Sequence, residues 1–331
     1  RVSAGDSSTV FAARNDTDAI AVAFNDDTHL KQHLNDIERI GEAESAESAR
    51  EIAETLGATL YPVRDLRPAL RDLRDAHVVF NLCEGVLGNP RYEMHFALAL
   101  EMLGIPFTGA DPIAAGLCTD KILVKRLLNV HGITTPRDDV FPAIVKPSRE
   151  DAGVGIDAAS VVKTKEEAEA RKRYIEETYR QPALIEEFID GREFNQAMYL
   201  DRMLPPGEIV FADELAPEER VVGWKAKWAS GSREDRATVN VTPGVMSDTL
   251  RRDISDLCRK AADVLSIRGY CRMDIRQRPT GELCIVDINP NPDIGPDSGF
   301  RKALAAAGIG FRDFLEELMM SALSRNSRRT A

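Results

Sequence analysis

One strand near the C-terminus combines an apolar core pattern with oxygen-bearing side chains. In "ELCIVDINPNPDIGPDSG" (282–299), Asp287 and Asn289 are two residues apart, so both side chains leave the same face of the strand. The preceding strand, "YCRMDIRQ" (270–277), is expected to pair with it across "RPTG" and to bring Asp274 onto that face. Two carboxylates and an amide oxygen suit Mg²⁺, which also takes water and phosphate oxygens. We therefore favour a magnesium site over the alternative, an exposed acidic strand face.

A magnesium site of this kind suggests a nucleotide triphosphate, whose phosphates need further partners. Lys121 in "TDK" and Lys146 in "AIVKPS" are candidate cations, and the loop "DAGVG" (151–155) offers backbone N–H groups around Gly153 and Gly155. Each signal is weak alone, because a lysine at a strand end is usually solvated. The chain has no Gly-Lys-Ser/Thr of a Walker loop, and the glycine loop lacks the third glycine and the helix of a dinucleotide fingerprint.

Composition limits the classes of partner. The chain has 331 residues, 43% hydrophobic and 29% charged, which predicts a globular protein of two or three domains. A net charge of −11 argues against nucleic acid or an anionic membrane as the main partner. No apolar run approaches the roughly 18 residues of a membrane helix. Five cysteines without a Cys-x-x-Cys pair indicate buried, reduced thiols, so we expect a cytoplasmic protein.

The first third of the chain alternates strands and helices, which predicts a small parallel α/β domain. The expected strands are 18–24 and 77–83, and the expected helices are 45–58 and 91–103. A further helix in "TDKILVKRLLNVHG" would begin at an N-cap, Thr119.

The remainder of the chain has a different texture. A capping box of Thr164 and Glu167 opens one helix, and Asp190-Gly191 is a hairpin signal. Residues 213–244 show no periodicity and are predicted to form long, partly mobile loops. The other expected elements are strands at 143–148, 182–189 and 192–200, and a helix at 247–266.

Taken in order, five motifs resemble those of one superfamily. "TDK", "AIVKPSREDAGVG", "LIEEFIDGREF", "CRMDI" and "IVDINPNPDIGPDSG" are similar to the ATP-grasp ligases, most closely to the D-alanine–D-alanine ligases. "FTGADPIAAGLCTDK" resembles the stretch by which those enzymes enter their central domain. The resemblance runs from about residue 77 to the C-terminus and is more specific for the superfamily than for its substrate.

The resemblance implies an α/β ATP-grasp fold, in which an N-terminal parallel α/β (pre-ATP-grasp) domain is followed by two α+β subdomains that enclose ATP. The expected domains are 1–118, with 1–17 disordered; 119–190, with the cover loop; and 191–331, with the metal and amine-substrate sites. The implied cofactors are ATP and two Mg²⁺ or Mn²⁺ ions. The implied partners are small amino-acid-like substrates, and a homodimer is allowed.

The resemblance also implies roles for individual residues. Lys121 and Lys146 would hold the phosphates, with Gly153 and Gly155 in the cover loop. The nucleoside would be bound by Glu186, the backbone of Glu187, Phe188 and Ile189, and Glu193. Asp274 and Asp287 would bind one metal, and Asp287 and Asn289 a second. The remaining roles fall to Arg272 beside the reacting carboxyl, Lys227 in the long loop, and Ser298, which would grip the carboxylate of the incoming amino acid.

Departures from the family pattern gather around the first-substrate pocket. The glycine-rich "GGxSxE" loop after the first strand is missing, and Glu84 stands where the family has histidine. Ala152 and Gly153 replace two serines of the cover loop, and Trp228 replaces a tyrosine.

These departures predict an ATP-dependent carboxylate–amine ligase that forms an amide through an acyl phosphate, with altered substrates. The alternatives are a genuine D-alanine–D-alanine ligase, a non-catalytic ATP-binding regulatory module, and a kinase that stops at a phosphorylated product.

Overall fold

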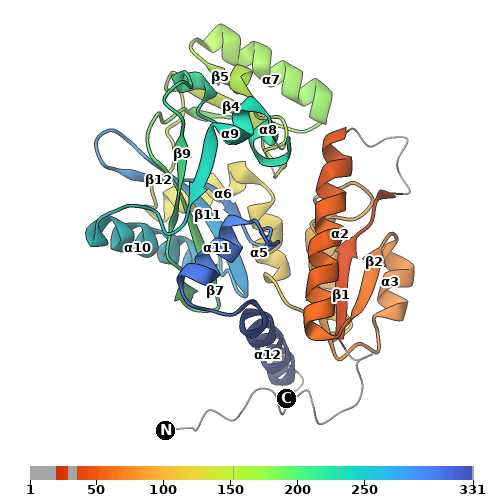
Figure 1. Ribbon diagram of the computed structural model, residues 1–331. Helices are drawn as coiled ribbons and strands as arrows, with labels where there is room; N and C mark the ends of the chain where they lie inside the picture. The colour runs from red at the N-terminus through yellow and green to blue at the C-terminus, as the bar shows by residue number, and fades with distance from the viewer. Residues whose placement is uncertain (1–19, 29–35, 152, 230, 330–331) are drawn as a thin grey trace.

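The computed structural model describes residues 20–28, 36–151, 153–229 and 231–329 (Figure 1). The disorder predicted for residues 1–17 lies outside these ranges. Three sheets organise the described chain, and no helix in it is long and apolar enough to cross a membrane.

The N-terminal sheet has three parallel strands in the order β2-β1-β3, as the alternating pattern predicted. All four residues of β3 are buried, which is typical of parallel strands covered on both faces. The sequence prediction missed β2 and α3. The elements are β1 (Ile20–Asn25), α2 (Asp36–Leu56), β2 (Thr59–Val63), α3 (Leu66–Asp72), β3 (Val78–Asn81) and α4 (Tyr92–Met102).

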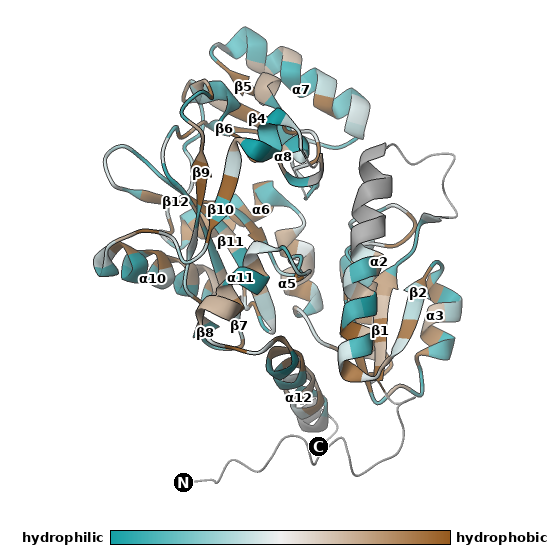
Figure 2. Cartoon of the chain, viewed as in Figure 1, coloured by the Kyte–Doolittle hydropathy of each residue, from teal (hydrophilic) through white to brown (hydrophobic). Residues whose placement is uncertain are grey.

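The second sheet has three antiparallel strands in the order β5-β4-β6, with α7 against it. Figure 2 shows the largely hydrophilic α7 covering the hydrophobic strand β4. The capping box of Thr164 and Glu167 is confirmed, whereas the predicted cap Thr119 is wrong, because Asp120 caps α6 by accepting a hydrogen bond from Leu123 N. The elements are α5 (Pro112–Cys118), α6 (Lys121–Val130), β4 (Ala143–Pro147), β5 (Val161–Val162), α7 (Lys165–Tyr179) and β6 (Ala183–Glu187).

The third and largest sheet is antiparallel, in the order β10-β9-β7-β11-β12, with β8 paired to β7. The loop prediction for 213–244 is wrong in part, because α8, α9 and β10 lie there. The elements are β7 (Glu193–Tyr199), β8 (Arg202–Met203), β9 (Gly207–Phe211), α8 (Trp224–Trp228), α9 (Arg233–Arg236), β10 (Thr238–Val241), α10 (Asp248–Val264), β11 (Tyr270–Gln277), β12 (Leu283–Asn289), α11 (Gly299–Ala306) and α12 (Phe311–Arg329).

The hairpin predicted at Asp190-Gly191 is also wrong. Strand β6 belongs to the three-stranded sheet and β7 to the large one, so residues 190 and 191 carry the chain between sheets. A Cβ atom on Gly191 would lie 1.9 Å from the carbonyl oxygen of Gln277. Glycine is therefore needed for the close approach to β11, and not for a tight turn.

The N-terminal sheet and the large sheet share one hydrophobic core. Phe24 and Phe80 belong to the same buried cluster as Tyr199, Tyr270 and Phe314. Helix α12 contacts both α2 and β3, which fixes the N-terminal sheet against the C-terminal part of the chain. We keep the three domains 1–118, 119–190 and 191–331 as a proposal, because each contains one sheet.

Candidate functional site

A solvent-open cleft with about 750 Å³ of empty space lies between the second sheet and the large sheet. Most of the predicted nucleotide and metal residues line it, although they come from distant parts of the sequence. Those residues are Lys121, Lys146, Gly153, Glu186, Glu187, Phe188, Ile189, Glu193, Lys227, Asp274 and Asp287.

The β11–β12 hairpin builds the acidic wall of the cleft. Asp274 is directly opposite Asp287 in the register, and Arg272 is opposite Asn289, which confirms the pairing predicted from the sequence. The register shifts immediately after Asp274. All four side chains therefore lie at the same end of the hairpin, on the strand positions that leave one face.

Lys121 is buried between two carboxylates. Its Nζ lies 2.8 Å from Asp151 Oδ1 and 3.0 Å from Asp287 Oδ1. Burial by itself would raise the pKa of Asp287, but the positive charges of Lys121 and Lys146 lower it to about 2. Asp287 is therefore ionised at neutral pH, as a metal ligand must be.

The side chain of Lys146 extends from β4 to β12, the strand that carries Asp287 and Asn289. Its Nζ lies 2.9 Å from Glu186 Oε1 and donates to the carbonyl oxygen of Val286 at 3.1 Å. Glu186 also accepts a hydrogen bond from Lys125 at 3.2 Å. The Lys146 ammonium is therefore held at the floor of the cleft, one residue from Asp287.

Lys227 lies in α8 and is a cation without a hydrogen bond or ion pair in the described part of the chain. Burial lowers its pKa and the charge of Arg272 lowers it further, while Asp274, Asp287 and Asp151 act in the opposite direction. Arg272 is held by Asp274 through two hydrogen bonds of 2.9 and 3.1 Å. Both cations thus face the acidic wall, and Lys227 is free to meet an anion.

The end of β6 and the segment after it form the side of the cleft opposite β12. The carboxylate of Glu187 points away from the cleft floor to Arg137 and Arg278, at 2.6 Å each. Its backbone N–H donates to the carbonyl oxygen of Arg137. The backbone at 187–189 is therefore held from behind while it lines the cleft.

Glu193 lies at the start of β7 and is buried. It pairs with Arg276 at 2.5 Å, and Arg276 also donates to the carbonyl oxygen of Ile189 at 3.1 Å. Burial raises the pKa of Glu193, and the charge of Arg276 opposes this.

The donor set at Asp274, Asp287 and Asn289 consists only of hard oxygen atoms, which fits Mg²⁺ or Mn²⁺. Asn289 Oδ1 accepts a hydrogen bond from Asn291 N at 2.8 Å, so its amide oxygen is oriented. Across the described ranges, no three or more His, Cys, Asp or Glu side chains gather into a metal site. The set therefore has two carboxylates, and the amide and the substrate would have to complete it.

Other predicted residues surround the cleft without lining it. Ser298 is the N-cap of α11 and accepts a hydrogen bond from Arg301 N at 3.1 Å. Gly155 packs against Pro147 and has a positive φ of 73°. Residue 152 and the side chain of Trp228 lie outside the described part of the structure.

Glu84 follows β3 on the N-terminal domain and faces the acidic wall. Its side chain is accessible to solvent, although many protein atoms surround it. Burial, with the negative charges of Asp151 and Asp293, raises its pKa to about 8, while Arg272 and Lys227 oppose the shift. Glu84 is not among the residues that line the cleft.

Sequence reasoning missed Asp151, Lys125 and Arg276. Asp151 stands in the quoted loop "DAGVG", and its partner Lys121 became visible only in the tertiary structure. Lys125 lies four residues after Lys121 on α6, so a shared helical face was an available signal. No local pattern marked Arg276, because its partners come from other elements.

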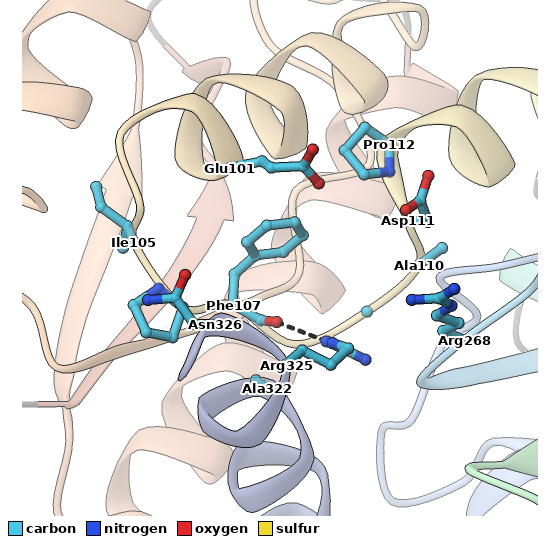
Figure 3. Close-up of a pocket in the computed structure, with 12 residues that line it drawn as sticks. Glu101, Ile105, Phe107, Ala110, Asp111, Pro112, Arg268, Ala322, Arg325 and Asn326 are labelled. Atoms are coloured by element: carbon cyan, nitrogen blue, oxygen red, sulfur yellow. Dashed lines mark hydrogen bonds between the residues drawn. The ribbon is translucent and has the colours of Figure 1, made fainter. Parts of the chain in front are cut away.

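A second hollow lies at the junction of the N-terminal domain and α12. Figure 3 shows Arg325 donating to the carbonyl oxygen of Phe107, with Glu101, Asp111 and Arg268 around the space. None of the predicted site residues lines this hollow, so it is separate from the cleft.

The chain is similar to known proteins over most of its length. Residues 134–320 match the family described as D-ala D-ala ligase C-terminus. An uncharacterised protein of Sinorhizobium fredii is 30% identical over 261 residues, covering 74% of each chain. The D-alanine–D-alanine ligase of Glaesserella parasuis is 28% identical, over 83% of this chain and 91% of its own.

Solved structures support the fold. The D-alanine–D-alanine ligase of Bacillus anthracis, complexed with ATP, superposes with a TM-score of 0.73 at 19% identity, covering 94% of this chain and 99% of its own. The D-Ala:D-Ser ligase of Enterococcus faecalis gives a TM-score of 0.68 at 18% identity, covering 92% and 99%.

Proposed function

Because this chain belongs to the D-alanine–D-alanine ligase family of ATP-grasp, ATP-dependent C–N ligases, we propose that it joins the carboxylate of one amino-acid-like substrate to the amine of another through an acyl phosphate. The single observation that carries the proposal is the cleft in which Lys121, Lys146 and Lys227 face Asp274 and Asp287. Phosphoryl transfer requires positioning and charge neutralisation more than covalent help, and these side chains supply both.

ATP would lie in the cleft with its phosphates toward the lysines. Lys146 is held by Glu186 and by the carbonyl oxygen of Val286, so it would meet a phosphate without reorganising. The nucleoside would lie along the backbone of 187–189, with Glu193 toward the ribose. Asp274, Asp287 and Asn289 would hold one or two Mg²⁺ or Mn²⁺ ions, which supply Lewis-acid charge to the transferred phosphoryl group.

Arg272 and Ser298 would act in the second half of the reaction. Attack of the amine develops negative charge on the carbonyl oxygen, and the fixed guanidinium of Arg272 would stabilise it. Ser298, at the N-terminus of α11, would donate its hydroxyl hydrogen to the carboxylate of the amine substrate, where the helix dipole also favours an anion.

An acyl phosphate hydrolyses when water reaches it, so the site must be covered during reaction. Gly153 of the cover loop packs under the long loop, since a Cβ atom on it would lie 2.9 Å from the backbone of Gly223. Helix α2 contacts α8, so the N-terminal domain touches the same cover. These contacts support a closing role for the loops at 149–155 and 213–244.

The first-substrate pocket supports altered specificity. Glu84 stands where the family has histidine, and its pKa is raised, so its carboxylate would favour a cationic or donating partner. We therefore expect D-alanine to be a poor first substrate. A genuine D-alanine–D-alanine ligase would contradict this expectation.

The test is a screen of paired amino acids with ATP and Mg²⁺, following ADP release and the mass of the product. An amide that requires both substrates supports the ligase. A stable phosphorylated product in place of an amide would indicate a kinase. ATP binding without turnover across the panel would indicate a regulatory module. If the protein makes D-alanyl-D-alanine efficiently, and Glu84→Gln leaves the rate unchanged, then it has the specificity of an ordinary D-alanine–D-alanine ligase.

Two further proposals concern the state of the protein. Met102 at the end of α4, Leu103 directly after it and Ile113 on α5 are exposed apolar side chains, which supports a homodimer through this face. Sedimentation would test it, with Met102→Glu expected to shift a dimer to monomer. All five cysteines are free and buried, which supports a reducing compartment such as the cytoplasm.

A further inference from the structure

Arg276 is a buried cation inside the nucleotide cleft. It lies two residues after Asp274 on β11, which pairs with β7 in an unbroken register, so the two side chains leave the same face of the strand. Both residues line the cleft, and Arg276 is 7% exposed. A charge removed from water is costly unless it is paired, so the contacts of its guanidinium indicate what it does there.

The guanidinium of Arg276 joins three segments of the chain. Its Nη1 donates to the carbonyl oxygen of Ile189 at 3.1 Å, and its Nη2 donates to the carbonyl oxygen of Arg220 at 2.7 Å. Nη2 also lies 2.5 Å from Oε2 of Glu193. Ile189 and Glu193 line the cleft, and so do the two residues that follow Arg220. One side chain therefore holds together the segment after β6, the start of β7 and the long loop (213–244).

These contacts require an arginine. The planar guanidinium also lies over two aromatic rings, 5.8 Å from the ring centre of Phe188 and 5.3 Å from that of Phe211. Arginine presents five N–H donors in a fixed fork, whereas lysine carries one ammonium at the end of a flexible stem. A lysine in place of Arg276 would keep the charge but could not meet all three segments at once.

The carboxylate of Glu193 keeps hydrogen-bonding capacity for a ligand. Glu193 is opposite Arg276 in the register of β7 and β11, and its Oε2 atom is buried without a hydrogen-bond donor in the described part of the chain. The hydrogen bonds of the guanidinium go to the two carbonyl oxygens, so Arg276 supplies Glu193 with a charge and not with a donor. A buried acceptor of this kind calls for a donor from the ligand.

The long loop connects the same point to the cover of the cleft. The two residues directly after Arg220 line the cleft. A Cβ atom on Gly223 would overlap the carbonyl oxygen of Ile156, so the long loop packs closely against the end of the cover loop. The hydrogen bond from Arg276 to Arg220 therefore fixes the chain three residues before that contact.

We propose that Arg276 is a positioning residue, which directs the Glu193 carboxylate to the ribose hydroxyls of the nucleotide and ties the long loop to the same point. This inference rests on the proposed ATP-dependent function. The ribose hydroxyls supply the donors that Glu193 lacks, and the carboxylate and the loop are then ordered together when the nucleotide binds. Arg276 acts through these neighbours, because its own hydrogen bonds already go to the backbone.

The first experiment measures binding, so that it does not depend on turnover. ADP, 2′-deoxy-ADP and 3′-deoxy-ADP are titrated by calorimetry into the full chain with Mg²⁺ and without amino acids. The ribose preference is the ratio of the dissociation constant of the weaker deoxynucleotide to that of ADP. We expect a ribose preference of at least about tenfold in the native protein, as the loss of one hydrogen bond to a charged group allows.

Variants then assign the ribose preference to Arg276. Arg276→Met removes the charge and the hydrogen bonds, and should reduce the preference to near one while the affinity for the deoxynucleotides changes less. Arg276→Lys restores the charge alone and should retain part of the preference; it decides the question if Arg276→Met does not fold. Arg192→Met is the matched control, because Arg192 adjoins Glu193 and pairs with Glu208 at 2.7 Å but does not line the cleft. It should leave the preference unchanged.

The second experiment follows the long loop. Amide hydrogen exchange is measured for peptides from 213–244, with and without saturating ADP. Bound nucleotide should slow the exchange in the native protein and in Arg192→Met. At the same occupancy it should slow the exchange less in Arg276→Met, because the hydrogen bond that ties Arg220 to the ribose end is gone.

The outcomes separate this inference from the proposed function. Equal weakening of all three nucleotides in Arg276→Met would indicate a merely structural role and overturns the inference, as does an unchanged ribose preference in either folded variant. Amide synthesis by a native protein without a ribose preference overturns it and leaves the ligase intact. A ribose preference that Arg276→Met removes, in a protein that makes no amide from any pair, supports the inference and overturns the ligase.

Discussion

The Glu187 ion cluster is expected to hold the nucleotide cleft together, and Glu187→Gln tests it. Glu187 ends β6 of the second sheet, while Arg278 lies in the turn between β11 and β12 of the large sheet. The Arg278 guanidinium is 7% exposed and the Glu187 carboxylate 9% exposed, at 2.6 Å from each other. The pair therefore joins two sheets across the back of the site.

The expected loss of stability follows from this burial. Removing one partner of a buried pair costs about 3–5 kcal/mol, because the other charge stays uncompensated. Two features reduce the cost here. Glu282 still faces Arg278, and the second partner, Arg137, is 60% exposed and regains water. We therefore expect Glu187→Gln to lower the free energy of unfolding by about 3 kcal/mol, at the lower end of that range.

The assay is urea or thermal unfolding at pH 7, with ATP kinetics measured in parallel. Glu218→Gln is the control, because its pair with Lys163 also joins separate segments but is largely exposed, so its loss should change the stability far less. The Michaelis constant for ATP should rise in Glu187→Gln, since the backbone at 187–189 loses its support. Equal losses in the two variants would refute the reasoning.

The pH dependence gives a second check on the same residue. Hydrogen bonds from Arg137 hold the pKa of Glu187 well below its ordinary value of 4.5, with burial acting against them and Arg278 adding to them. A lowered pKa contributes stability that is fully present above the unfolded value and is lost as the pH falls through the folded value. The gap in stability between the native protein and Glu187→Gln should therefore shrink below pH 4.5. If the difference in stability between the two proteins stays constant down to pH 3, the lowered pKa of Glu187 is contradicted.

Four further substitutions separate the steps of the reaction. Asp287→Ala should abolish ATP turnover in a folded protein, measured by ADP release, because it removes the carboxylate opposite Asp274; near-normal turnover with full Mg²⁺ dependence would show that the metal wall is elsewhere. Lys146→Ala should raise the Michaelis constant for ATP at least tenfold, and an unchanged constant would remove it from the phosphate site. Ser298→Ala should raise the Michaelis constant of the amine substrate more than that of ATP, and should also cost about 1 kcal/mol of stability through loss of its helix cap, so Ser298→Thr serves as control. Arg272→Ala should mainly lower the turnover number, by about 2.7–4 kcal/mol of barrier, and a change confined to binding would argue against its role in the transition state.

The sequence by itself determined the parts of this protein whose signals are local. The strand pairs around "RPTG", the capping box at Thr164 and the helix at 247–266 all follow from periodicity, turn chemistry and capping, which act within a few residues. The same local reasoning brought Asp274, Asp287 and Asn289 to one face, because strand geometry and a short turn leave few alternatives.

Only the tertiary structure decided what depends on contacts between distant segments. Asp190-Gly191 has the composition of a hairpin, yet the need for a close approach to Gln277 sends the chain into another sheet. Asp151 and Lys121 are thirty residues apart, and Glu187 and Arg278 ninety-one, so no spacing rule could pair them. Charges find their partners through folding of the whole chain, and for that reason these ion pairs became visible only in the tertiary structure.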